Sequence, residues 1–246
     1  MPKFFVSPDK VSGNTIRIDT GDVQHITRVL RLEKGDVVTI SDSTGTDYEA
    51  EISQIGKDAV ICNILSEKKN SSESNISVTI FQALPKGTKM EYIIQKNTEL
   101  GVVKIVPCAL SRCVVKLDGK DAKKKCERWQ KIADEAAKQS GRGVIPVIGD
   151  VMSFKAAAEE MKKSDFSFVP YESEEDTGLK ELLKMHTDAV NISFMIGPEG
   201  GFAPEEIAYL DDMGIKRVTL GPRILRTETA GEATLAILMY ELGDMG

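Results

Sequence analysis

The amino-acid sequence predicts an α/β protein in two parts: a small β-barrel with one helix in residues 1–70, and an α/β layer with a largely parallel sheet in residues 76–246. Short β-rich segments separated by turns fill the first part. Residues 67–75 are polar and without periodicity, which is typical of a linker. Strand-like and helix-like segments then alternate to the end of the chain, as in a parallel sheet covered by helices.

The first part contains three segments with strand composition and one with helical spacing. Turn-forming residues at 42–45 and 56–58 separate the strands. Val23, Ile26, Val29 and Leu30 recur at helical spacing, which predicts a helix over 22–30. The expected strands are 37–40, 48–52 and 59–64.

The second part alternates buried-type strands with helices that have clear start or stop signals. A helix over 90–100 is followed by a long one with a single apolar face, which ends at Gly141 in the position after the C-cap. Pro204 opens another helix, where a proline in the first turn costs no hydrogen bond. The last helix covers 227–242. The expected strands are 76–84, 103–107, 166–169, 192–196 and 218–220.

Composition limits the class of protein. The chain has 246 residues, of which 41% are hydrophobic and 28% charged, as in soluble globular proteins. No apolar run approaches the roughly 20 residues of a membrane helix, and the N-terminus lacks the features of a signal peptide. We therefore expect a cytosolic protein that does not enter a membrane.

Cysteines and histidines are too few and too scattered for a metal centre. The cysteines form no Cys-x-x-Cys pair, and the chain has only two histidines. We therefore expect no metal site. A disulfide framework is not expected in a chain of this length. The cysteines are Cys62, Cys108, Cys113 and Cys126.

Charge is unevenly distributed along the chain. The net charge is −6, yet residues 76–143 contain 14 Lys and Arg against 7 Asp and Glu, a local net charge of +7. A basic segment within an acidic protein creates a localised field that attracts phosphate to one face. We interpret the acidic residues 172–176 as a solvated surface loop.

Two Gly-Pro turns, each after a hydrophobic strand, predict a small-molecule site. They are Ile196–Phe202 and Leu220–Ala230, and neither is a dinucleotide fingerprint or a P-loop. Glycine allows close approach of a ligand to main chain, and the flanking apolar residues can wall a slot for a flat ring. Arg226 beside this slot suits contact with an anion. Thr227 can cap the last helix, and Glu228 suits its positive end.

Basic residues also follow the ends of the predicted strands and of the long helix. Lys86 and Lys89 follow one strand, Arg112 follows the next, and Arg142 follows the helix end that also contains Gln139. Open α/β sheets bind ligands at the carboxyl ends of their strands. This placement favours a site for phosphate over a general contribution to solubility.

Six motifs in order along the whole chain resemble the bacterial ribosomal small subunit methyltransferase E family. They are His25–Arg31, Gln82–Gly87, Gln95–Gly101, Glu135–Arg142, Gly197–Phe202 and Leu220–Ala230. The resemblance implies a PUA-like β-barrel for RNA binding over residues 1–70 and a SPOUT methyltransferase domain over residues 76–246. It also implies a C-terminal trefoil knot, a rare exception to the rule that chains do not thread loops.

The resemblance further implies S-adenosylmethionine as cofactor, a homodimer, and methylation of uracil N3 on a uridine of 16S rRNA near the decoding centre. Arg226 and Glu228 would be the catalytic residues. The implied cofactor contacts are Val169, Pro170, Ile196, Gly197, Gly200, Gly201, Leu220, Gly221, Ile224, Leu225, Arg226 and Thr229. The implied RNA contacts are Arg28, Arg31, Lys86, Lys89, Arg112, Gln139 and Arg142.

The chain departs from its relatives at the N-terminus, where Lys3 stands in a strand that is arginine-rich in many of them. Lysine keeps the charge but lacks the bidentate fork of arginine. A role for this strand in RNA contact is therefore open.

Uracil N3 lies on the Watson–Crick edge and carries a proton, so the target base must be unpaired or flipped out. We expect Arg226 to stabilise the developing imide anion, with Glu228 or water accepting the proton. Three alternatives remain at this point: a non-catalytic rRNA-binding or ribosome assembly factor, methylation of another RNA position, and a small-molecule enzyme using another nucleotide. The basic segment disfavours the last of these.

Overall fold

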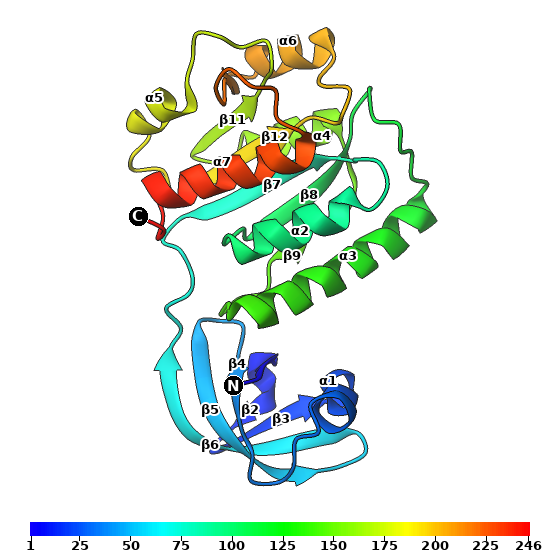
Figure 1. Ribbon diagram of the computed structural model, residues 1–246, viewed down its shortest axis with the longest axis vertical. Coiled ribbons are helices and arrows are strands. Elements are labelled where there is room, and N and C mark those ends of the chain that lie inside the picture. The colour runs from blue at the N-terminus through cyan, green and yellow to red at the C-terminus, as the bar shows by residue number, and fades with distance from the viewer. The chain divides into compact units, whose positions relative to one another are not determined.

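The computed structural model describes residues 1–246 apart from the side chain of Thr20. The chain forms two compact units (Figure 1). The first comprises residues 1–73 and 137–145, and the second comprises 74–136 and 146–246. Residues 137–145 thus belong to the first unit, although they follow more than sixty residues of the second, and a linear division near residue 70 does not anticipate this.

The first unit is built around a curved six-stranded sheet in the order β1-β4-β5-β6-β3-β2 (Figure 1). All neighbouring strands are antiparallel except β1 and β4. In β3 the side chains of Ile16 and Ile18 are buried and those of Thr15 and Arg17 exposed, the alternation of a strand with one face on a core. The strands are β1 (Lys3–Phe5), β2 (Val11–Ser12), β3 (Thr15–Asp19), β4 (Val37–Ser41), β5 (Thr46–Ile55) and β6 (Ala59–Lys69). A 3-10 turn covers Pro8–Lys10.

The predicted helix over 22–30 is present but changes type midway. It is α-helical over α1 (Thr20–Gln24) and π-helical over His25–Val29. Ile26 is buried, as the helical spacing predicts, but Val29 has 66% of its surface exposed. The prediction that Val29 and Leu30 share the buried face is wrong. A π-helical hydrogen bond joins residues five apart instead of four, which rotates the residues that follow away from the buried face.

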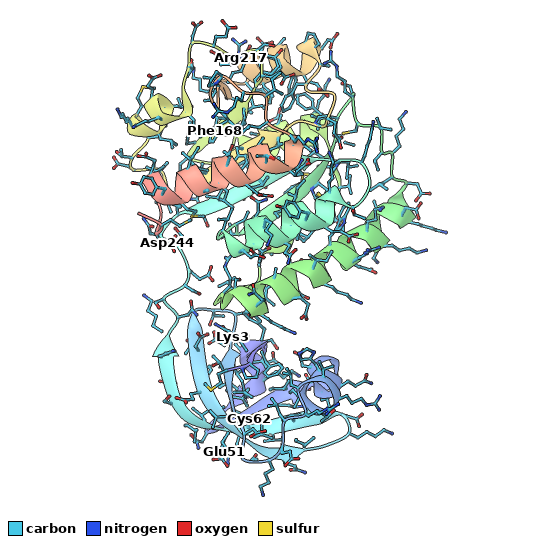
Figure 2. All side chains as sticks on the ribbon, in the orientation of Figure 1. Lys3, Glu51, Cys62, Phe168, Arg217 and Asp244 are labelled. Atoms are coloured by element: carbon cyan, nitrogen blue, oxygen red, sulfur yellow. The ribbon has the colours of Figure 1, made fainter. Side chains whose placement is uncertain are left out.

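Buried polar contacts attach residues 137–145 to the first unit. Arg142, whose side chain is 3% exposed, pairs with Glu73 at 2.6 Å. Glu73 also accepts hydrogen bonds from the main-chain N–H groups of Gly143 and Val144. Lys3 pairs with Asp47 at 2.9 Å and is 7% exposed, and it donates to the carbonyl of Gly141 (Figure 2). The charge of Lys3 is therefore used within the fold.

The predicted linker begins three residues later than its composition suggests. Strand β6 continues to Lys69, because residues 67–69 pair with residues 46–48 of β5. Only residues 70–76 lie outside regular structure between β6 and the next strand.

The second unit has a parallel sheet in the order β10-β8-β7-β12-β11-β13, with β9 paired to β8. Phe168 and Phe194 stack with ring centroids 5.7 Å apart in its core (Figure 2). The strands are β7 (Ser77–Ala83), β8 (Lys104–Ala109), β9 (Val147–Ile148), β10 (Met152–Ser153), β11 (Phe166–Pro170), β12 (Asn191–Ile196) and β13 (Lys216–Val218).

Helices connect these strands, and α2 and α7 pack against each other along one face of the sheet (Figure 1). The helices are α2 (Lys89–Glu99), α3 (Gly119–Ser140), α4 (Phe154–Met161), α5 (Leu179–Lys184), α6 (Pro204–Asp212) and α7 (Thr227–Glu241). The expected helix stop at Gly141 is confirmed by its φ of 73°, and Pro204 occupies the first turn of α6 as expected.

Two parts of the second unit differ from the sequence-based expectations. Strand β13 ends at Val218 and does not include Leu220, because the chain turns at Gly221, whose φ is 102°. Helices α4 and α5 and the two-residue strands β9 and β10 were not predicted, since segments this short have little periodicity.

We expect Glu73→Ala to destabilise the first unit by about 3 kcal/mol, because it leaves the buried guanidinium of Arg142 without its carboxylate. Urea unfolding of the full chain measures the loss, and hydrogen exchange at residues 137–145 locates it.

Lys163→Met is the matched control, since it removes an ion pair with Glu160 in which the Lys163 side chain is 73% exposed. We expect that substitution to cost under about 1 kcal/mol. Equal stability of the two variants would contradict a structural role for the pair between Arg142 and Glu73.

Candidate functional site

A cavity of about 1050 Å³ lies at the carboxyl ends of three neighbouring strands of the second unit. Its walls are residues 170–175 after β11, residues 196–202 after β12 and residues 219–227 after β13, with Lys89 of α2 and Ala230 of α7. Parallel strands place their carboxyl ends at one edge of a sheet, so these segments meet although they are distant in sequence. Both Gly-Pro turns singled out in the sequence contribute walls.

The turn after β12 needs its glycines for two different reasons. A Cβ on Gly197 would lie 3.0 Å from the ring of Phe202, so a side chain there would require that ring to move. Gly201 has a φ of 66°, which favours glycine, and its N–H donates to the carbonyl of Pro198. The turn is therefore tight and presents main chain to the cavity.

The wall formed by residues 219–227 combines an open turn with an exposed apolar side chain. The Thr219 hydroxyl accepts a hydrogen bond from the N–H of Gly221, which fixes the turn. Ile224 is 86% exposed, and Arg223 and Arg226 beside it are also exposed. Apolar and cationic groups thus stand together at the cavity.

The third wall is the acidic loop over residues 172–176. Most of this loop is exposed, as expected of a solvated surface loop, and Glu172, Glu174 and Glu175 also line the cavity. Glu174 is held by the guanidinium of Arg217 at 3.6 Å, and it accepts hydrogen bonds from the main-chain N–H groups of Asp176 and Thr177. The loop therefore brings carboxylates to the edge of the cavity.

The hydroxyl of Thr227 joins three elements at the base of the site. It donates to the carbonyl of Gly197 at 2.8 Å and accepts from the side-chain amide of Gln82 at 3.0 Å. Gln82 is fully buried in β7, and Thr227 begins α7. This chain of hydrogen bonds sets where the helix starts relative to the turn after β12.

Three charged side chains form a cluster beside the cavity. The ammonium of Lys89 lies 3.1 Å from Glu199 and 3.2 Å from Glu228. Hydrogen bonding to Glu199 and then to Glu228 raises the pKa of Lys89. Burial alone would raise the pKa of Glu199. Its carboxylate, however, interacts with main-chain N–H groups, including that of Lys86, and with the Lys89 ammonium, and the net effect is a lowered pKa. Lys89 is therefore a cation and Glu199 an anion at neutral pH.

Most residues expected to contact a cofactor line the cavity. Two expected cofactor contacts and one expected catalytic residue do not. Val169 is fully buried in the core under β11, so its side chain cannot reach a ligand. Thr229 and Glu228 lie in the first turn of α7 outside the cavity wall, and Glu228 faces Lys89. The expected residues that do line it are Pro170, Ile196, Gly197, Gly200, Gly201, Leu220, Gly221, Ile224, Leu225 and Arg226.

The sequence-based prediction missed several lining residues, of which Tyr171, Glu199 and Thr227 matter most. Glu199 lies inside the Gly-Pro-Glu-Gly-Gly turn, and its charge within a glycine-rich turn was the available signal. Thr227 was interpreted as a helix cap, but its hydroxyl bonds to Gly197 and Gln82, and no side-chain cap is formed.

The residues expected to contact RNA are divided between the two units. Arg28, Arg31 and Gln139 are exposed in the first unit. Lys86 and Arg112 are exposed in the second, and Arg112 donates to the carbonyl of Gly200 at 3.0 Å.

One of these expectations is contradicted. Arg142 is only 2% exposed and bonded to Glu73, so its proposed contact with phosphate is wrong. Lys89 pairs with Glu199 and lines the cavity, and its contact with RNA stays a prediction.

Other reactive groups do not gather at the cavity. All four cysteines are buried, and burial raises the pKa of Cys62 to about 11, which keeps it a thiol. In the part of the chain that the structure describes, no three His, Cys, Asp or Glu side chains are placed to hold a metal ion. Among the same residues, no helix is both long enough and apolar enough to cross a membrane.

Two family models match this chain. Residues 72–239 match the model of an RNA methyltransferase domain, and residues 18–65 match that of an RNA methyltransferase PUA domain. The chain is 37% identical to the ribosomal RNA small subunit methyltransferase E of Bacillus subtilis, over 98% of this chain and 97% of that protein. It is 31% identical to the protein of the same name from Synechocystis, over 95% of this chain and 76% of that protein.

Solved structures show the same fold across the whole chain. A ribosomal RNA small subunit methyltransferase E from Neisseria gonorrhoeae, bound to S-adenosyl methionine, superposes with a TM-score of 0.90 at 31% identity and covers 100% of both chains. A Legionella pneumophila structure in complex with the bound cofactor SAM has a TM-score of 0.89 at 30% identity, covering 99% of this chain and 98% of that one.

We expect Thr227→Val to lower the free energy of unfolding by about 2 kcal/mol, because valine has the same shape but leaves the Gly197 carbonyl and one Gln82 donor unpaired. Urea unfolding measures the effect. Thr187→Val, at an exposed position, is expected to change it by less than about 0.5 kcal/mol. If both substitutions were neutral, the hydrogen-bond chain would not hold the base of the site.

Proposed function

Because the chain belongs to the ribosomal RNA small subunit methyltransferase E family, we propose that it transfers a methyl group from S-adenosylmethionine to N3 of a uracil in 16S rRNA. The observation that carries this proposal is the cavity walled by the two Gly-Pro turns at the carboxyl edge of the sheet. Relatives of that name match along nearly the full length of the chain, which supports the same activity here.

The lining residues fit S-adenosylmethionine. A volume of about 1050 Å³ is large enough for a nucleoside with an amino-acid tail and an adjoining base. Ile196, Leu220 and Leu225 offer an apolar surface to a flat ring, and Glu172 and Glu174 can hold the cationic tail. When bound, this cofactor supplies a methyl group attached to a positively charged sulfur.

Arg226 is our candidate for the substrate side of the cavity. It is exposed at the N-terminal end of α7 and lines the cavity. The target uracil must leave its base stack to present N3 there. The guanidinium can then donate to a carbonyl oxygen of the ring, where negative charge develops as N3 loses its proton.

We propose that RNA is held outside the cavity by exposed cations of both units. Lys86 and Arg112 stand close to the cavity segments of the second unit, since Lys86 N–H and Arg112 bond to the turn after β12. Arg28 and Arg31, with Gln139, would contribute from the first unit, which we propose is the RNA-binding domain. We also propose a cytoplasmic location, which an rRNA substrate supports.

We also propose that the enzyme is a homodimer and that residues 219–227 are part of a trefoil knot. Exposed Tyr92 of α2 and exposed Ile237 and Tyr240 of α7 support a subunit interface on this helix pair. Thr219 pairs with Gly178, so the chain after β13 runs beside the segment that precedes α5, which supports a threaded arrangement.

The test of the proposed function is mass mapping of 16S rRNA from a strain that lacks this protein. We expect the purified protein with S-adenosylmethionine to add one methyl group to N3 of one uridine in small ribosomal subunits from that strain. Arg226→Ala is expected to slow this transfer about 100-fold, because it removes one donor to the developing anion, with cofactor affinity retained in calorimetry.

Other outcomes of that experiment identify the alternatives. Methylation at a different nucleotide would show another RNA position as the target. Absence of both methyl transfer and cofactor binding would indicate a non-catalytic rRNA-binding or ribosome assembly factor on the same fold.

For the RNA contacts, we expect Arg112→Ala to weaken binding of the small ribosomal subunit, and to reduce the slope of log affinity against log salt concentration by about 1. Filter binding at several salt concentrations measures this. Lys162→Ala, at an exposed position outside the cavity segments, should leave the slope unchanged. An unchanged slope in the Arg112 variant would contradict its contact with phosphate.

A further inference from the structure

Lys89 is held at the cavity by carboxylates from two other elements. Glu199 lies in the turn after β12 and Glu228 in the first turn of α7. Their oxygens are 3.1 and 3.2 Å from the Lys89 ammonium, which itself lines the cavity. Only 33% of the Lys89 side chain is exposed. The ammonium is therefore fixed where three elements meet, unlike a lysine that moves freely in solvent.

The two carboxylates determine what Lys89 can do. They hold it protonated at neutral pH, so it cannot act as a base. An ammonium has three N–H donors. The two carboxylates lie at ion-pair distance from it, which leaves at least one donor for a group in the cavity. Lys89 is accordingly suited to donate a hydrogen bond to a ligand oxygen.

The geometry of methylation at N3 makes such a donor useful. The N3–H bond lies in the plane of the ring between two carbonyl groups, and the new bond to the methyl carbon must take the same direction. A base that accepts the proton cannot stay in front of N3 while the methyl group arrives. The proton must leave first, and the resulting charge is shared by N3 and the two carbonyl oxygens. Donors beside those oxygens stabilise this anion.

We infer that Lys89 is a catalytic residue that donates a hydrogen bond to one carbonyl oxygen of the target uracil, while Arg226 donates to the other. This inference rests on the proposed function. In the step, the N3–H bond breaks and its proton passes to solvent water. The electron pair left on N3 forms the bond to the methyl carbon, and the sulfur keeps the electrons of the bond that breaks. An anion and a sulfonium thus become two neutral products.

The same geometry gives Glu228 a different role from the one first expected. Its carboxylate faces Lys89 and lies outside the cavity wall, so it positions the ammonium and does not take the proton from N3. Glu199, in the turn after β12, also positions Lys89. The other charged groups around the cavity are Glu172, Glu174, Glu175, Arg223 and Arg226.

The test compares Lys89→Met with the wild-type protein in single-turnover methylation of reconstituted small ribosomal subunits. Their 16S rRNA is transcribed with either uridine or 5-fluorouridine. Fluorine withdraws electrons and makes N3 more acidic, so the substituted ring needs less help to lose its proton. We expect the variant to be about 100-fold slower on uridine at neutral pH. The deficit should shrink markedly on 5-fluorouridine, and also on uridine as the pH is raised.

Two further variants separate this role from a structural one. Lys89→Arg keeps a cationic donor and is expected to retain more activity than Lys89→Met. Lys96→Met removes another lysine of α2, which pairs with Glu99 at 2.9 Å, and is expected to keep wild-type rates on both substrates. Calorimetry should show wild-type affinity of Lys89→Met for S-adenosylmethionine, which establishes that the cavity is intact.

An equal deficit on both substrates and at every pH would overturn the role of Lys89 in stabilising the anion, as would loss of cofactor affinity in Lys89→Met. Failure of the proposed function is a separate result. In that case the wild-type protein itself would place no methyl group on uracil N3.

Discussion

The hydrogen bond from the Thr227 hydroxyl to the Gly197 carbonyl is the constraint on which the site depends. It connects the start of α7 to the turn after β12, and Gln82 extends the connection into the central strand β7. Arg226, directly before Thr227, is thereby placed at the cavity. Glu228, directly after it, is directed to Lys89. One buried hydroxyl thus sets the positions of the charged residues that precede and follow it in the chain.

Much of the fold could be predicted because its elements have strong local signals. The central strands β7 and β12 are rich in buried apolar residues, and Pro204 and Gly141 mark helix ends by backbone chemistry that needs no tertiary context. The failures arise where tertiary contacts decide the structure. The π-turn at His25–Val29 exposes Val29 against its helical spacing. Residues 137–145 join the first unit through Glu73 and Lys3, which are distant in sequence.

The site was partly predictable for the same reason. Glycines with positive φ and the strands before them are local features, so both Gly-Pro turns were identified and both line the cavity. Pairing between charged residues is not local. The sequence contains the charges of Arg142, Lys3 and Lys89, but not the carboxylates that each one meets. The local excess of positive charge in residues 76–143 therefore overstates the surface available to phosphate.

The distribution of charge around the cavity also bears on turnover. In the proposed reaction, one reactant carries a sulfonium and the other an imide anion before methyl transfer, and afterwards neither of these charges remains. Lys89 and Arg226 would then lose the negative charge that they attract, whereas Glu172 and Glu174 would keep the cationic tail, because the tail does not react. Charged groups that are held by ion pairs and hydrogen bonds within the protein do not change position when the products become neutral. In the proposed reaction the fixed cations would therefore stabilise the deprotonated uracil more than its neutral methylated product, which favours both loss of the N3 proton and release of the product.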